Sequence, residues 1–217
     1  MLYIVSTPIW NLEDITFRAV RILKEVDFIA CEDTRTSWVL LKHYDIKNNL
    51  ISFHSYSDER KLGKIIDLLK EWKNIALISD AWTPWISDPA YNLVKKALEE
   101  NIDISPIPWA SALLSALVVS WLHTHDFRFI GFLPIKKWRQ TLLISLQSKD
   151  YTVIIYESVH RLLKTLDDLE KYFWMEHKIL IGREITKKFE EFKRWTVAEC
   201  KEYFKKQNLK WEFVIIF

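Results

Sequence analysis

Six polar segments of this chain carry side chains that could do chemistry, and each follows a short apolar run. The six are Ser6–Asp14, Ala30–Arg35, Ser79–Pro89, Ile107–Ala112, Tyr156–Arg161 and Gly182–Glu191. Carboxylates in them could move a proton, and basic side chains could hold phosphate. The third segment is the most informative, because prolines, aspartates and hydroxyl residues together form a rigid ligand platform rather than a flexible connector. We therefore expect ligands to bind where strands end.

Plainer interpretations exist for several of these segments. Asp33 or Thr34 could simply cap the next helix. The small residues of Ile107–Ala112 could serve close helix packing, and Ser6–Asp14 could be an ordinary strand-to-helix turn. If either of the last two segments, Tyr156–Arg161 and Gly182–Glu191, stood alone, its charged residues would be interpreted as ordinary surface charge. Two such segments at equivalent strand ends favour one site facing the first half.

Other chemistries find no support in the residue pattern. Cys31 lies beside Glu32 and Asp33, whose charges raise a thiol pKa and disfavour a thiolate nucleophile. The six histidines show no metal-ligand spacing, so we expect no metal site. A phosphate-binding Gly-x-x-x-x-Gly-Lys loop and a Ser/His/Asp elbow are both missing from the sequence.

Short β-branched runs alternate with amphipathic patterns, and over the first half of the chain this alternation indicates βαβ units and a largely parallel sheet. Expected strands are Leu2–Ser6, Phe28–Cys31, Leu50–Phe53, Ile75–Ser79, Ile102–Pro106, Phe127–Gly131, Thr152–Tyr156, Ile179–Gly182 and Phe213–Phe217. Expected helices are Ile15–Glu25, Thr36–Tyr44, Asp58–Glu71, Tyr91–Glu100, Ser111–Ser120, Trp138–Gln147, His160–Phe173 and Val197–Lys206. The break falls near Trp121–Asp126, which predicts two α/β domains, residues 1–119 and 120–217.

Composition narrows the class of protein. The net charge of +2 does not by itself indicate a nucleic-acid binder, although residues 120–217 hold the excess of basic side chains. The 49% of hydrophobic residues exclude a disordered chain, and two cysteines suit a reducing cytoplasm rather than a disulfide scaffold. Neither a signal peptide nor a membrane span is expected, since the longest uncharged run, Ile104–Leu122, contains prolines.

The glycine and tryptophan content is abnormal. About 15 glycines would be usual in a chain of this length, but only 3 occur, beside 11 tryptophans. Trp10, Trp82, Trp85 and Trp109 lie in turns rich in Pro, Asp and Ser, where glycine is common. Trp72 and Trp174 follow helix patterns at the position that glycine favours.

We infer that many of these tryptophans stand where glycine belongs. The simplest cause is a gene in which UGA encodes glycine, translated with a table in which UGA encodes tryptophan. The alternative is a surface rich in tryptophan that stacks on RNA bases. The codons distinguish the two, because UGG at all eleven positions would end the proposal.

Together the six segments closely resemble the ribosomal RNA small-subunit methyltransferase I family, the 16S rRNA cytidine 2′-O-methyltransferases of the tetrapyrrole-methylase superfamily. The matching blocks are Thr7–Thr16, Glu32–Arg35, Ser79–Pro89, Pro108–Ala112, Tyr156–Arg161 and Arg183–Glu191, in order along residues 2–217. The family has glycine where this chain has Trp10, Trp82, Trp85, Trp109, Trp195 and Trp211, and usually near Trp72, Trp121, Trp138 and Trp174. It also has proline at Val159 and often a further C-terminal segment.

The resemblance implies two α/β domains with S-adenosylmethionine (SAM) bound in a cleft between them, a homodimer, and a substrate in 16S rRNA. It implies cofactor contacts from Pro8, Trp10, Asp80, Ala81, Thr83, Ser87, Ser111 and Ala112. It implies RNA contacts from Arg35, His160, Arg161, Arg183 and Lys187.

Methyl transfer from a sulfonium mostly needs positioning. A ribose hydroxyl is nevertheless a weak nucleophile, so a general base should help. Glu32, Asp80 and Glu157 are the candidate catalytic bases, and the sequence does not rank them. Two alternatives remain: methylation of a precorrin-type tetrapyrrole by the same fold, and an RNA- or ribosome-binding protein without catalysis. A purely structural module is hard to reconcile with six polar blocks at strand ends.

Overall fold

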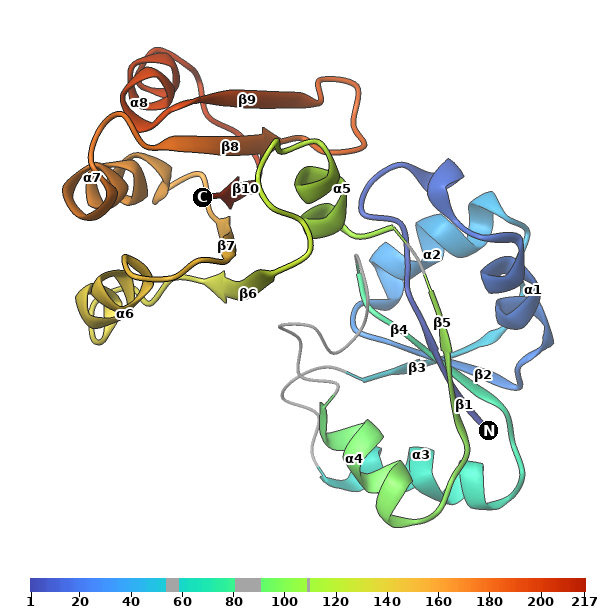
Figure 1. Ribbon diagram of the computed structural model, residues 1–217. Helices are drawn as coiled ribbons and strands as arrows, with labels where there is room; N and C mark the ends of the chain where they lie inside the picture. Colours follow the sequence, from blue (N-terminus) through green and yellow to red (C-terminus); the bar gives the residue numbers. More distant parts are fainter. Residues whose placement is uncertain (54–58, 81–90, 109) are drawn as a thin grey trace. The chain divides into compact units, whose positions relative to one another are not determined.

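A computed structural model describes residues 1–53, 59–80, 91–108 and 110–217 (Figure 1). Its contacts divide the chain into two compact units, Met1–Ser111 and Ala112–Phe217. This division places helix α5 in the second unit, whereas the sequence boundary after residue 119 would leave that helix in the first. Each unit is built on one five-stranded sheet.

The first unit has a fully parallel sheet in the order β3-β2-β4-β1-β5. Its strands are β1 (Leu2–Val5), β2 (Phe28–Cys31), β3 (Asn49–Ser52), β4 (Ile75–Ile78) and β5 (Ile104–Ile107). Its helices are the 3-10 turn η1 (Leu12–Asp14), α1 (Phe17–Glu25), α2 (Thr34–His43), α3 (Glu59–Lys70) and α4 (Tyr91–Glu99). The predicted βαβ alternation is therefore confirmed for this half.

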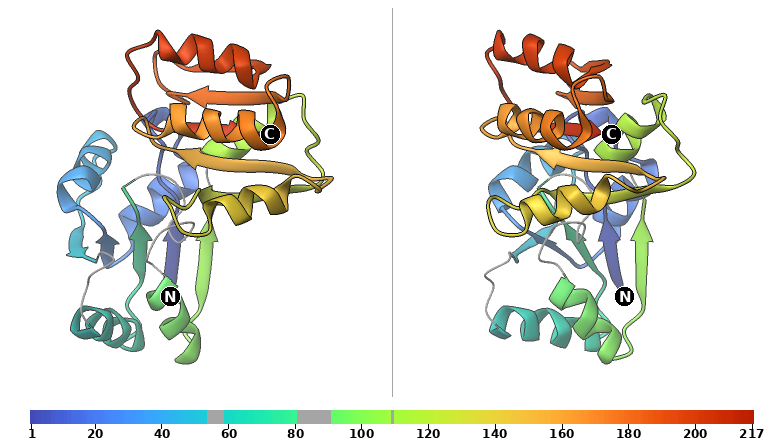
Figure 2. Two further views of the ribbon diagram at one scale, coloured as in Figure 1. Left: turned by 90° about the vertical axis from the view of Figure 1, so that its left-hand side faces the viewer. Right: turned by 60° about the vertical axis from the view of Figure 1, so that its left-hand side comes forward.

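Helices cover both faces of the first sheet because its strands are apolar on both sides. In β4, Ile75 and Leu77 pack with α3 and α4, whereas Ala76 and Ile78 pack with α1 and α2. Figure 2 shows the same separation of the two helix pairs from other sides. With both faces closed, the ends of the strands remain for ligand binding.

The second unit has a mixed sheet in the order β6-β7-β10-β8-β9, in which only β6 and β7 are paired in parallel. Its strands are β6 (Phe127–Phe132), β7 (Thr152–Glu157), β8 (Lys178–Arg183), β9 (Glu191–Thr196) and β10 (Phe213–Ile216). Its helices are α5 (Ala112–Val118), α6 (Arg139–Leu146), α7 (Leu162–Phe173) and α8 (Val197–Lys205). Strand β10, the last of the chain, enters between β7 and β8 and is antiparallel to both, which makes this sheet mixed.

A single core on one face of the second sheet joins α6, α7 and α8 to the strands. Helix α5 contacts β7, β8 and β10. Strand β9 was not expected from sequence, and its charged residues pair across to β8, with Glu191 opposite Arg183. Helix α8 begins at a capping box, in which the Thr196 hydroxyl and the Glu199 carboxylate satisfy each other's backbone N–H groups.

Among the tryptophans that the structure describes, four have a left-handed backbone, which glycine adopts at least cost. They are Trp72 (φ 64°), Trp138 (φ 68°), Trp174 (φ 57°) and Trp211 (φ 68°). Trp174 also has ψ 162°, a combination that is almost confined to glycine. This geometry supports the inference that these positions suit glycine.

The ends of three helices allow a direct comparison. After α3, Trp72 N–H donates to Leu69 O (3.1 Å) and Lys73 N–H to Leu68 O (3.1 Å), which is a Schellman motif with Trp72 in the left-handed place. The same pair of bonds ends α2 around Asp45 and α4 around Asn101. Asp and Asn tolerate this conformation, whereas an indole side chain gains nothing there.

Candidate functional site

The carboxyl ends of β1, β2, β4 and β5 meet at one edge of the first sheet, where their loops are bonded to one another. The Thr7 hydroxyl donates to Ser79 O (3.0 Å), which joins the loops after β1 and β4. Asp33 N–H donates to Asp80 Oδ1 (3.2 Å), which joins those after β2 and β4. Ser6 N–H donates to Ile107 O (3.3 Å) at the end of β5. The predicted cofactor segments thus share one edge.

Asp33 and Asp80 lie together at this edge but differ in their ionisation. Asp33 is the N-cap of α2, since its carboxylate accepts from Arg35 N–H (2.8 Å). Hydrogen bonds from the Arg35 side chain and backbone lower the pKa of Asp33 to about 2. The pKa of Asp80 is raised instead, first by partial burial, although the Asp33 N–H bond opposes this. Of the two, Asp80 has the carboxyl group that accepts a proton more readily.

The remaining predicted residues of the first unit differ in exposure. Pro8 is buried, Trp10 is exposed, and Glu32 is half-buried directly after β2. Ser111, the last residue of the first unit, is half-buried, and Ala112, the first residue of α5 in the second unit, is buried. Arg35 is almost wholly exposed, with its guanidinium 2.8 Å from Asp33 Oδ2. Ala81, Thr83 and Ser87 lie outside the described residues, as do Trp82, Trp85 and Trp109.

In the second unit, β6, β7 and β8 all end at the same edge of their sheet. This follows from the pairing, because β6 is parallel to β7 while β7 and β8 are both antiparallel to β10. Glu157 and Arg183 lie on either side of Phe213 in the register. The two charged segments predicted at equivalent strand ends therefore lie at one edge, together with the loop that follows β6.

Glu157 is fully buried, and its two oxygens have several partners. Oε2 accepts from the Thr165 hydroxyl (2.6 Å), and Oε1 accepts from Ser158 N–H (2.9 Å) and lies 3.2 Å from Arg161 Nε. The sequence left Glu157 open as a catalytic base. A carboxylate so enclosed is better suited to positioning Arg161, and this is the role that we assign to it.

The basic residues at this edge differ in their exposure and in the partners that they contact. His160 is exposed, whereas Arg161 also donates to Leu133 O. Arg183 Nε lies 2.6 Å from Glu191 Oε2, with both side chains largely buried. Lys187 Nζ lies 3.2 Å from the centroid of the Trp211 ring. Burial lowers the pKa of Lys187, and the charges of Glu184 and Glu212 oppose that shift.

Two residues that the sequence analysis did not select, Arg139 and Thr165, complete the buried part of this edge. Arg139 Nη2 donates to the Thr165 hydroxyl (2.8 Å), Nη1 donates to Pro134 O (3.1 Å), and Nε donates to Asp168 Oδ2 (2.7 Å). The signal was present in α6, where Arg139 shares the buried face with Leu143 and Leu146. A charged residue on an apolar helix face indicates a buried ion pair.

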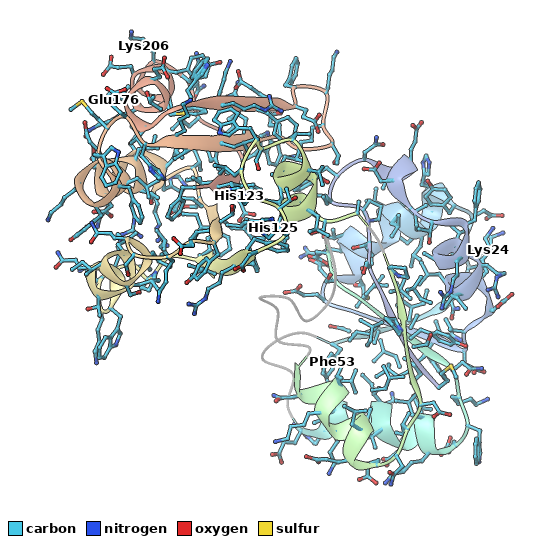
Figure 3. All side chains as sticks on the ribbon, in the orientation of Figure 1. Lys24, Phe53, His123, His125, Glu176 and Lys206 are labelled. Atoms are coloured by element: carbon cyan, nitrogen blue, oxygen red, sulfur yellow. The ribbon has the colours of Figure 1, made fainter. Side chains whose placement is uncertain are left out.

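Histidines 123 and 125 lie close together in the loop before β6, with ring centroids 5.5 Å apart (Figure 3). Among the residues that the structure describes, no group of three or more His, Cys, Asp or Glu side chains is arranged to hold a metal ion. Over the same residues, no helix combines the length and apolar character that crossing a bilayer requires.

A family model described as Tetrapyrrole (Corrin/Porphyrin) Methylases matches residues 1–201. The chain is 48% identical over 216 residues to the ribosomal RNA small subunit methyltransferase I of Halalkalibacterium halodurans, covering 99% of this chain and 74% of that protein. It is 44% identical over 215 residues to the protein of the same name from Thermotoga maritima, covering 99% and 96%.

Solved structures share the fold at low sequence identity. A diphthine synthase superposes with a TM-score of 0.77 at 13% identity, covering 99% of this chain and 88% of that one. A cobalt precorrin-4 methyltransferase gives a TM-score of 0.74 at 16% identity, covering 99% and 93%. Both likenesses concern the fold, and they confirm two α/β domains of the tetrapyrrole-methylase type.

Proposed function

The chain belongs to the ribosomal RNA small subunit methyltransferase I family within the tetrapyrrole methylases, and from this premise we propose that it transfers a methyl group from SAM to the 2′-hydroxyl of a cytidine in 16S rRNA. The single observation that carries the proposal is the 44–48% identity over nearly the whole chain to relatives that bear this name. The geometry of the two sheet edges supports it.

The edge of the first sheet fits a cationic cofactor. SAM, when bound, supplies an electrophilic methyl group on a positively charged sulfur. Asp80 offers a carboxyl group there, and Pro8 and the turn at Trp10 follow the neighbouring strand β1. We propose that these residues, with Ala81, Thr83, Ser87, Ser111 and Ala112, bind the cofactor.

The proposed reaction moves one methyl group and one proton. The C–S bond of the sulfonium breaks as the ribose 2′-oxygen forms its bond to the same carbon, and the hydroxyl proton leaves to a base or to water. Of the carboxyl groups at the first edge, Asp80 and Glu32 are the candidate bases, and the raised pKa of Asp80 suits proton acceptance better than the lowered pKa of Asp33. The exposed guanidinium group of Arg35 and the exposed imidazole ring of His160 suit contacts with the RNA backbone.

The proposal includes the setting of the reaction. Its substrate, 16S rRNA within the small ribosomal subunit, places the protein in the cytoplasm. We further propose that it acts as a homodimer, as the family resemblance implies. Sedimentation at micromolar concentration tests the second point, and a monomer that retains activity would contradict it.

A transfer assay separates this function from its alternatives. Purified protein is incubated with methyl-labelled SAM and either unmodified small subunits or a precorrin-type tetrapyrrole. We expect label in 16S rRNA alone. Label in the tetrapyrrole would favour the small-molecule alternative, and RNA binding without SAM affinity would favour a non-catalytic binding protein.

A further inference from the structure

A closed circuit of hydrogen bonds and one ion pair lies beneath the carboxyl edge of the second sheet. It begins at Pro134 O, passes through Arg139, Thr165, Glu157 and Arg161, and returns to Leu133 O. It therefore starts and ends on consecutive carbonyl groups of the β6–α6 loop, residues 133–138. We call these four side chains the arginine circuit.

The centre of the circuit is buried and its charges are balanced. Arg139 is 5% exposed and Glu157 is 0% exposed, whereas Arg161 and Asp168 are half-buried. The two guanidinium groups are matched by the carboxylates of Glu157 and of Asp168, which pairs with Arg139. Burying charges such as those of Arg139 and Glu157 is costly unless each is paired and hydrogen-bonded. An apolar core alone would hold α6 and α7 together without this energetic cost. We therefore infer that the buried charges serve another purpose, which is to hold the β6–α6 loop in one conformation.

The loop that the circuit holds is basic and exposed. Lys136 and Lys137 are both exposed, and Lys137 Nζ lies over the Trp138 ring (5.5 Å to its centroid). The loop after β7 adds exposed His160 at the same edge. Residues 133–138 and 158–161 include no acidic side chain, and Glu157 beneath them is paired. This distribution of charge fits a polyanion.

We propose that the β6–α6 loop contacts RNA phosphates through Lys136 and Lys137, and that the arginine circuit is the positioning device that fixes this loop. The proposal rests on the proposed function, because it takes RNA as the substrate. It adds two contact residues and assigns Arg139, Thr165 and Glu157 to positioning rather than to the chemical step.

The first test measures the salt dependence of binding to naked 16S rRNA, using the full chain as its gene encodes it. The slope of log K against log salt is negative, and each lost phosphate contact reduces its magnitude by about 0.7 to 0.9. The double variant Lys136→Ala and Lys137→Ala should therefore reduce that magnitude by about 1.5. A matched double variant, Lys149→Ala and Lys178→Ala, removes two exposed lysines before β7 and at the start of β8, at the opposite edge, and should leave the slope unchanged.

The second test concerns the circuit. Thr165→Val removes the hydroxyl that joins Arg139 to Glu157, and Thr165→Ser keeps it. We expect the valine variant to lose RNA affinity while SAM affinity stays unchanged, and the serine variant to restore RNA binding. An unchanged circular-dichroism spectrum shows that the second unit, which holds Thr165, is folded, and the lysine variants test the loop without disturbing any buried group.

The possible outcomes are separable. An unchanged slope in the Lys136/Lys137 variant, or equal losses in both lysine pairs, would overturn the proposal. Loss of affinity for the whole subunit but not for naked rRNA would also overturn it, by indicating a ribosomal protein as the partner. If the unaltered chain binds neither rRNA nor SAM, the proposed function itself fails.

Discussion

At individual tryptophan positions, the backbone conformation determines which residue type is tolerated. Trp72 and Trp174 are exposed and left-handed, so their rings bury little while their main chains adopt angles that disfavour any Cβ. The sequence predicted glycine-like positions at both, because each follows a helix pattern. Trp195 differs, because it lies in β9 with its ring against Tyr203 (5.2 Å between centroids). The contact between Trp195 and Tyr203 depends on the tertiary fold, so it could not be predicted from the local sequence.

Replacing Trp72 with glycine should stabilise the protein. Trp72→Gly relieves left-handed strain of about 1 kcal/mol, partly offset by the flexibility of glycine in the unfolded chain. Asn101→Gly is the matched control, since it has the same motif and nearly the same φ (56°), and it should change stability little. Urea unfolding of both variants measures the difference, and a destabilised Trp72→Gly would refute the assignment of that position.

The two aspartates at the first edge predict opposite responses to pH. The folded pKa of Asp33, about 2, lies below its ordinary value of 3.8. Its contribution to stability is therefore complete above pH 4 and lost as the pH falls toward 2. The raised pKa of Asp80 has the reverse effect, so its contribution declines as the pH rises above 3.8.

Unfolding free energies of Asp33→Asn and Asp80→Asn between pH 2 and 6 test this contrast. The stability advantage of the unaltered chain over Asp33→Asn should shrink as the pH falls from 4 to 2. Asn is an equally good N-cap, so the cap is preserved. Stability of Asp80→Asn relative to the unaltered chain should instead improve as the pH rises. The stability of each variant relative to the unaltered chain should therefore change with pH in opposite directions, falling for Asp33→Asn and rising for Asp80→Asn as the pH rises. A change in the same direction for both variants would contradict the assignment.

At the scale of elements, the local sequence pattern was sufficient to predict those strands that are buried on both faces. The run Ile75–Ser79 predicted a strand, and the structure has β4 there at Ile75–Ile78 with all four residues buried. Strand β9 could not be predicted in this way, since its sequence is largely charged and is stabilised by cross-strand pairs such as Arg183–Glu191. The arginine circuit was hidden for the same reason: its members come from two helices and a strand that meet only in the fold.

The circuit predicts an unequal response at two arginines. Arg139→Gln leaves Asp168 and the Thr165 hydroxyl without their buried partner and should cost about 3 kcal/mol of unfolding free energy. Arg21→Gln removes an exposed pair with Glu25 (2.9 Å) and should cost at most about 0.5 kcal/mol. Equal small losses on chemical denaturation would show that Arg139 is not held as described.

At the scale of the whole molecule, the six blocks were enough to predict the family, which the comparisons confirm. The arrangement of the second sheet was not predictable from local pattern, because the last strand of the chain enters its middle. Residues of the Ser79–Pro89 segment beyond Asp80 lie outside the described structure, so their role in cofactor binding stays a prediction.

The tryptophans also bear on activity. A ring at Trp82, Trp85 and Trp109 would occupy space that the family resemblance reserves for contact between backbone and cofactor. We expect the polypeptide with these tryptophans to bind SAM poorly and the version with glycine at the three positions to bind it. Calorimetry on both decides the matter, and equal affinity would defeat the expectation.

The most direct test of the account is nucleoside analysis of 16S rRNA. Unmodified small subunits are incubated with SAM and the chain as its gene encodes it, and the digested rRNA is examined by mass spectrometry. The account predicts one new 2′-O-methylcytidine, absent without the protein. A methyl group on a base, or no methylated nucleoside although the protein binds SAM, would contradict it.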